Sequence, residues 1–191
     1  MKNIQIHEIK PLKEHKFIHP VEISYTQKGV KKRWEAVESH DSVATLLYHT
    51  QKEAFLLVKQ FRPAVYINNS EDGFTYELCA GILDKEVSPK QTAKEEIDEE
   101  CGYDVGVENI EKVTSFYTSV GFAGARQTLY YAKIDESMKK HEGGGIHDEQ
   151  IELYYLPLSE AKAFALDESK PKTPGLMFAF YWFFENRLKT L

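Results

Sequence analysis

The sequence has few cysteines, no long hydrophobic run and no excess of basic residues. Its two cysteines, Cys79 and Cys101, form no CxxC pair, which argues against a thiolate zinc site and a disulfide scaffold. The longest apolar run, residues 176–184, is too short to span a bilayer, and the first ten residues contain no signal-peptide core. Acidic residues number 30 and basic residues 24, so the net charge of −6 gives no overall attraction to nucleic acid or to an anionic membrane. These absences predict a cytoplasmic protein that binds neither nucleic acid nor membrane.

The sequence does contain ample material for a packed core, because 42% of its 191 residues are hydrophobic and 13% are aromatic. A chain of this length forms one domain of ordinary size with at most a short additional lobe.

The first forty residues have the pattern of such a lobe. Apolar and polar side chains alternate along residues 21–26, Gly29 allows a turn, and residues 30–38 return as a second strand. Because an isolated hairpin is only marginally stable in water, we expect it to pack on another surface, with a second subunit as one partner. We therefore divide the chain into an N-terminal dimerisation segment, 1–40, and a main domain, 41–191.

The main domain combines strands and helices without regular strand–helix–strand alternation. We expect strands at residues 43–48, 54–61, 76–80, 113–118, 128–133 and 151–156. We expect helices at residues 89–101 and 159–165, and a last helix from Pro174 with Thr173 as its N-cap. This last helix is apolar on all sides and should be buried, in the core or between subunits. The pattern predicts an α+β or mixed fold in which helices cover a mixed β-sheet.

The helix over residues 89–101 has clear signals at both ends. Ser88 is a good N-cap, Pro89 suits the first helical position, and Gln91 completes an S-x-x-Q capping box. Gly102 follows the last helical residue and can adopt the left-handed conformation that ends a helix. The signals therefore bound this helix on both sides.

Five of the six residues 95–100 are carboxylic acids. On an α-helix Glu96, Glu99 and Glu100 fall within an arc of about 100°, beside an apolar stripe that borders the core. Like charges three or four residues apart destabilise a helix by roughly 0.2–0.5 kcal/mol per pair, and the C-terminal half of a helix disfavours anions further. A cation that prefers oxygen ligands, above all Mg²⁺, offsets this repulsion, so we take the three glutamates as metal ligands. The alternative is a solvated acidic helix face.

This segment resembles the Nudix box, whose pattern is G-x5-E-x7-R-E-x-x-E-E-x-G followed by an apolar residue. The required positions are occupied by Gly81, Glu96, Glu99, Glu100, Gly102 and Tyr103. Two positions depart from the pattern, because Val87 replaces the first glutamate and Glu95 replaces the arginine. In the family this arginine helps to hold the glutamates in place. Here an arginine of another element, Arg62 or Arg126, would have to serve.

The resemblance extends from about residue 40 to the C-terminus. The segments KQFRPAVY (59–66), ELCAG (77–81), SVGFAGARQT (119–128) and EGGG (142–145) are similar to those of nucleoside-diphosphate-sugar hydrolases, most of all the UDP-sugar (UDP-glucose) diphosphatase branch. The sister branch of ADP-ribose pyrophosphatases usually carries a proline downstream of the box, where this chain reads YTSVG.

The resemblance implies an α/β/α sandwich with a mixed β-sheet and dependence on Mg²⁺ or Mn²⁺. It implies hydrolysis of the pyrophosphate bond of a nucleotide sugar to a nucleoside monophosphate and a sugar 1-phosphate; ADP-ribose would give AMP and ribose 5-phosphate. It also implies a homodimer whose N-terminal strands exchange between subunits, and it adds the carbonyl of Ala80 as a metal ligand.

Hydrolysis also needs a base beside the attacking water. In this branch the base comes from a loop after the box, matched here by GGGIHDEQIE. Glu149 is therefore the first choice for the base, with Glu152 and Asp148 behind it. Glu99 is also counted as catalytic, because it is a ligand of the metal. The three glycines would let this loop close over the substrate or form a plain flexible linker.

Substrate binding needs cations for the phosphates, and Arg62 and Arg126 are the candidates, because a guanidinium engages two oxygens at once. Each also suits a surface or structural role. Glu77 either pairs with Arg62 in the site or is structural. Trp34 either stacks on a nucleobase across the dimer or packs as an ordinary aromatic residue.

Two other classes of function stay open at this point. One is a Nudix-fold binding module that has lost catalysis and senses a nucleotide, which the departures at Val87 and Glu95 would explain. The other is an acidic structural domain that binds cations without a specific ligand.

Overall fold

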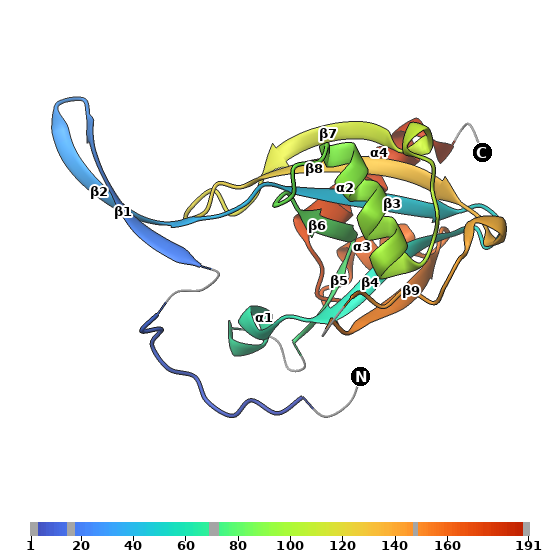
Figure 1. The fold of residues 1–191 in the computed structure, drawn as a ribbon, viewed down its shortest axis with the longest axis horizontal. Helices are drawn as coiled ribbons and strands as arrows, with labels where there is room; N and C mark the ends of the chain where they lie inside the picture. Colours follow the sequence, from blue (N-terminus) through green and yellow to red (C-terminus); the bar gives the residue numbers. More distant parts are fainter. Residues whose placement is uncertain (1–3, 15–17, 69–72, 147–148, 189–191) are drawn as a thin grey trace.

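The computed structural model describes residues 4–14, 18–68, 73–146 and 149–188. A β-sheet with helices on both faces forms the body, and a two-stranded hairpin extends from it (Figure 1). The strands are β1 (His19–Gln27), β2 (Val30–Glu38), β3 (Ser42–His49), β4 (Ala54–Phe61), β5 (Phe74–Glu77), β6 (Cys79–Ile82), β7 (Glu111–Tyr117), β8 (Arg126–Ile134) and β9 (Ile151–Pro157). The helices are α1 (Pro63–Asn68), α2 (Pro89–Glu96), the π-helical turn η1 (Ile97–Cys101), the 3₁₀ turns η2 (Val107–Asn109) and η3 (Glu136–Met138), α3 (Ala161–Leu166) and α4 (Pro174–Asn186).

The body is a seven-stranded mixed sheet in the order β5-β4-β3-β8-β7, with β6 paired to β3 and β9 paired to β4. Strands β3 and β8 run parallel, whereas the other pairs are antiparallel. The first half of β3 pairs with β6 and its end pairs with β4. This register places Gly81 of β6 opposite Val43, beside the start of the central strand.

Alternate residues of the strands build two cores, one on each face of the sheet. Phe55 and Phe180 belong to the core under α3 and α4, whereas Leu56 and Ile97 belong to the core under α2. Figure 1 shows α2 across one face of the sheet, with α3 and α4 behind the other. The predicted α/β/α sandwich with a mixed sheet is therefore confirmed.

The predicted hairpin is present. Lys28 and Gly29 turn the chain with φ of 52° and 77°, which suits the twist of a tight two-residue turn. The hairpin extends away from the body (Figure 1) and touches it where Trp34 Nε1 donates to the Gly121 carbonyl at 2.8 Å and Val37 N donates to the Phe122 carbonyl at 2.8 Å. Large apolar side chains on the hairpin, namely Ile23, Tyr25, Val30 and Trp34, stay exposed in the single chain.

Three features differ from the predictions. Helix α1 follows β4 where no element is predicted, and it begins at Pro63, a residue suited to a first helical turn. The strand predicted at 76–80 is two strands, β5 and β6, which separate at the buried Leu78. Helix α4 is buried on one face only, because Phe178 and Tyr181 are 45% and 47% exposed. Among the described residues, no helix has both the length and the apolarity needed to cross a membrane.

Candidate active site

The carboxylate helix begins and ends where its capping residues predict. The Ser88 hydroxyl accepts a hydrogen bond from Gln91 N at 3.1 Å, and Gly102 ends the helix with φ of 77°. The second part differs from a regular α-helix, because residues 97–101 wind as the π turn η1. Such turns occur often at functional sites.

Two of the three box glutamates lie directly against strand β6. Glu100 is buried, and its Oε2 accepts a hydrogen bond from Ala80 N at 3.0 Å. The half-buried Glu96 lies on the backbone of Gly81, where an added Cβ would be 1.9 Å from Glu96 Oε1. Glycine at position 81 therefore makes room for this carboxylate. Glu99 is half-buried on the same helix end.

The backbone of Ala80 is also directed toward the carboxylate helix. Ala80 is opposite Ala44 in the β3–β6 ladder, and its N–H donates to Glu100. Residues of an antiparallel pair direct their N–H and C=O groups to the same edge. The Ala80 carbonyl is therefore directed off β3, toward the edge that Glu100 occupies.

The crowding of these carboxylates changes their protonation. Burial raises the pKa of Glu100 to about 8 and outweighs the opposing hydrogen bond from Ala80 N–H, and the negative charges of Glu96 and Glu149 add smaller upward contributions. Burial and the negative charges of Glu99 and Glu149 raise the pKa of Glu96 to about 7. Both groups therefore hold protons near neutral pH unless a cation balances them.

Arg62, one of the two candidates for the role of the missing box arginine, pairs with Glu77 and not directly with a box glutamate. Its Nε and Nη2 donate to the two oxygens of Glu77 at 2.8 Å each. The positive charge of Arg62 also interacts electrostatically with the carboxylates of Glu100 and Glu149. The structure thus pairs Arg62 with Glu77. Glu95, which occupies the arginine position, instead accepts a hydrogen bond from Gln91 at 3.0 Å and forms an ion pair with a lysine of the preceding loop.

The structure separates the two described candidates for the base. Glu149 interacts electrostatically with Glu96 and Glu100, and its Oε2 accepts a hydrogen bond from Ile146 N at 3.0 Å. Glu152 lies in β9, where its neighbours on either side pack into the core under α2. Because side chains alternate along a strand, Glu152 points to the other face of the sheet. Asp148 lies outside the described residues.

Two further predicted site residues make hydrogen bonds to segments other than the carboxylate helix. Arg126 begins β8 and is exposed; by alternation it shares the face of Tyr130, which packs under α2, and its N–H donates to Asp41 at 2.8 Å. Trp34 lies on the hairpin against Gly121 of its own chain, with its side chain half exposed.

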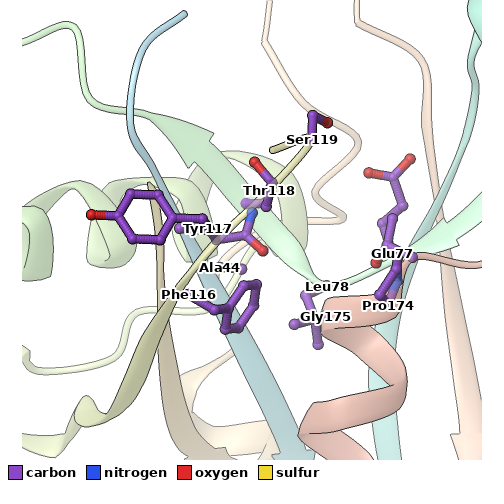
Figure 2. A pocket seen from close by; sticks show the side chains of 12 residues that line it. Ala44, Glu77, Leu78, Phe116, Tyr117, Thr118, Ser119, Pro174 and Gly175 are labelled. Carbon is purple, nitrogen blue, oxygen red and sulfur yellow. The ribbon is translucent and has the colours of Figure 1, made fainter. Parts of the chain in front are cut away.

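A pocket of about 360 Å³ opens on the other side of β6. Figure 2 shows the Glu77 carboxylate on one side of it, Phe116 and Thr118 across from it, and the start of α4 at Gly175. The sequence predictions miss this pocket, because its walls come from five strands and a helix that are distant along the chain. Its lining residues are Ala44, Glu77, Leu78, Ala80, Phe116, Tyr117, Thr118, Ser119, Gln127, Thr173, Pro174 and Gly175.

The donor set at the helix end is of the kind that a hard divalent cation prefers, because Glu96, Glu99, Glu100 and the Ala80 carbonyl offer oxygen atoms only. Burial, together with the negative charge of neighbouring carboxylates, raises the pKa of Glu96 and of Glu100, and a bound cation would favour their charged forms. Within the described part of the chain, no three His, Cys, Asp or Glu side chains lie close enough together to hold a metal ion as they stand.

Comparisons with known proteins agree with this geometry. A family model for the NUDIX domain matches residues 38–175. The chain is 36% identical to a uridine diphosphate glucose pyrophosphatase of Bos taurus, with 88% of each chain covered. It is 34% identical to the protein of the same name of Mus musculus, covering 89% of each, and 39% identical to a GDP-mannose pyrophosphatase of Pectobacterium atrosepticum, covering 86% of each.

The raised pKa of Glu100 predicts how the metal-free protein responds to pH. Because the folded state binds this proton more tightly than the unfolded state, the free energy of unfolding should fall as the pH rises from 5.5 to 8.5. In Glu100→Gln this fall should be smaller, by on the order of 3 kcal/mol. Urea unfolding in EDTA at both pH values measures the difference. The exposed Glu142→Gln should retain the wild-type fall, and an equal fall in Glu100→Gln would contradict the assignment.

Proposed function

Because this chain belongs to the Nudix family of hydrolases, we propose that it hydrolyses the pyrophosphate bond of a nucleoside diphosphate hexose, with UDP-glucose as the leading substrate. The observation that carries this proposal is the cluster of Glu96, Glu99 and Glu100 against β6, whose charge calls for a divalent cation. The names of the relatives, which specify UDP-glucose and GDP-mannose, support a nucleotide sugar.

In this proposal Glu96, Glu99, Glu100 and the Ala80 carbonyl hold Mg²⁺, with Mn²⁺ as a substitute. When bound, the ion neutralises the charge of the pyrophosphate and lowers the pKa of a coordinated water. The oxygen donors and the negative charge of the site support this choice over softer metals.

The side chains of the protein carry the remaining steps. Arg62, fixed by two bonds to Glu77, directs its remaining guanidinium face to a phosphate, and Arg126 offers a second cation on the same face of the sheet. Glu149 accepts a proton from the attacking water, whose oxygen bonds to phosphorus while the bridging P–O bond breaks. The products are a nucleoside monophosphate and a sugar 1-phosphate.

The pocket beside Ala80 is suited to the sugar. The hydroxyl and amide groups of Thr118, Ser119 and Gln127 can exchange hydrogen bonds with sugar hydroxyls, and Phe116 offers an apolar surface. Trp34 remains the proposed stacking partner of the nucleobase, contributed across a dimer.

A panel of UDP-glucose, GDP-mannose, ADP-ribose and a dinucleoside polyphosphate tests the substrate. With Mg²⁺ we expect UMP and glucose 1-phosphate from UDP-glucose, with a kcat/KM at least about tenfold above that for ADP-ribose or the polyphosphate. Glu99→Gln should fold normally and lose roughly 10²-fold or more in kcat, because one ligand charge is lost.

Chromatography of the products and circular dichroism of the variant give both readouts. If ADP-ribose gives the highest kcat/KM, UDP-glucose is not the preferred substrate and the chain acts as an ADP-ribose pyrophosphatase. Nucleotide-sugar binding by calorimetry without any monophosphate at high Mn²⁺ would instead indicate a binding module.

The base is tested by removing each carboxylate in turn. Glu149→Gln should lower kcat by roughly 10²–10⁴-fold with a small change in KM, since the amide cannot accept the proton. The fold-decrease in kcat in Glu152→Gln should be at least about tenfold smaller than that in Glu149→Gln, because the side chain of Glu152 points to the other face of the sheet. Glu142→Gln, exposed in the same segment, is the matched control. A larger loss in Glu152→Gln than in Glu149→Gln would reverse the assignment.

We further propose that residues 1–40 form a dimerisation segment, with residues 41–191 as the catalytic domain, and that strands of the segment exchange between subunits of a homodimer. The exposed apolar face of the hairpin supports this, because a two-stranded hairpin is marginally stable without a covering surface.

Sedimentation of the full chain tests the dimer. The wild type should sediment at twice the chain mass of 22.0 kDa. Ile23→Asp combined with Trp34→Asp should shift it toward the monomer, because both exposed apolar residues lie in the same cross-strand pair. Thr26→Asp, on the other face of β1, controls for the added charge. A wild-type monomer at micromolar concentration would contradict the proposal.

A further inference from the structure

The segment after η3 wraps around the end of the carboxylate helix. Lys140 N donates to the Gly102 carbonyl at 2.8 Å, Gly144 N donates to the Glu100 carbonyl at 2.8 Å, and Gly145 N donates to the Glu99 carbonyl at 3.1 Å. Two consecutive residues of this glycine strap, defined here as Gly143, Gly144 and Gly145, therefore bond to the backbone of two box glutamates.

The position of these two carbonyls at the C-terminal end of the helix explains why they need outside donors. The closing bonds of the helix run from Gly102 N to the Asp98 carbonyl at 2.8 Å and from Tyr103 N to the Ile97 carbonyl at 3.4 Å. The first of these is the single bond with which many glycine-capped helices end. The carbonyls of Glu99 and Glu100 thus fall beyond the last intrahelical bond, and a buried carbonyl without a donor is costly.

Glycine is required in the strap for two reasons. All three residues have positive φ, of 67°, 107° and 86°, which other residues rarely adopt. An added Cβ at Gly143 would lie 2.4 Å from the Glu100 carbonyl oxygen, and one at Gly145 would lie 2.7 Å from both Cβ and Oε2 of Glu149. At Gly144 the nearest atom would be 3.7 Å away, so that position has space.

The strap also holds the other side of the site. Ile151 N donates to the Gly144 carbonyl at 3.2 Å, and Ile146 N donates to Glu149 Oε2 at 3.0 Å. One short stretch of backbone therefore joins the helix end that carries Glu99 and Glu100 to the segment that carries Glu149. These bonds fix the glycines, so they do not form an unattached linker.

We propose that Gly143–Gly145 is a positioning element that sets the distance between Glu149 and the carboxylates of the helix end. The roles of Glu149 and of these carboxylates rest on the proposed function. A Cβ added at Gly143 would meet the backbone of Glu100 on the helix side, whereas a Cβ added at Gly145 would meet the side chain of Glu149. The two contacts should therefore fail separately when each glycine is replaced.

Alanine substitutions separate the two contacts. Gly143→Ala should displace Glu100, weaken Mn²⁺ binding and lower kcat, each by roughly tenfold or more. Gly145→Ala should lower kcat by a similar factor while Mn²⁺ affinity stays within about twofold, because the displaced group is Glu149. In Gly144→Ala the backbone is strained but the added Cβ has space, so kcat should fall less than in Gly143→Ala or Gly145→Ala. Gly124→Ala is the matched control, since Gly124 has φ of 67° and nothing within 4 Å of an added Cβ.

Mn²⁺ binding by calorimetry and steady-state kinetics give these readouts. Equal kcat values in Gly143→Ala, Gly145→Ala and Gly124→Ala would overturn the proposal, and so would an equal loss of Mn²⁺ affinity in Gly145→Ala and Gly143→Ala.

Hydrogen exchange on the wild-type protein covers the case in which a variant does not fold. We expect the amides of Gly144 and Gly145 to be protected in the metal-free protein, and exchange at the rate of an unstructured peptide would contradict the strap. A wild type that hydrolyses no nucleotide sugar would refute the proposed function instead, while this exchange measurement would still test the strap.

Discussion

The crowding of negative charge at the end of one helix is the constraint on which the rest of the site depends. Glu96, Glu99 and Glu100 lie within one turn, and burial with mutual repulsion raises the pKa of the first and third into the neutral range. Two neighbouring cations, Arg62 and Lys85, are each paired with another carboxylate. The site therefore keeps negative charge that an oxygen-preferring divalent ion is suited to balance.

Several parts of the fold serve to hold this unfavourable arrangement. The pairing of β6 with the start of β3 turns the Ala80 N–H toward Glu100, and the absent side chain of Gly81 leaves space for Glu96. The glycine strap donates to the carbonyls of Glu99 and Glu100 at the C-terminal end of the helix. Such local exceptions to ordinary helix rules, each compensated by a neighbouring element, are expected where a site serves chemistry more than stability.

The sequence predicts the features that local chemistry determines. Capping by Ser88 and Gly102 bounds the carboxylate helix, and alternation defines the hairpin, as the structure confirms. The bond from Gly144 N to the Glu100 carbonyl could not be predicted, because the two residues lie far apart along the chain. The pocket is likewise assembled from distant segments. The motif match ranks Glu149 ahead of Glu152, but only the alternation along β9 shows that Glu152 points away from the face of α2.

The central claim is that the carboxylate cluster exists to bind a divalent cation. Anomalous X-ray diffraction from crystals soaked in Mn²⁺ tests it most directly. The account predicts an anomalous peak within coordination distance of carboxylate oxygens of Glu96, Glu99 and Glu100 and of the Ala80 carbonyl. A structure at full Mn²⁺ occupancy with the peak elsewhere, and with these carboxylates directed to bulk solvent, would contradict it.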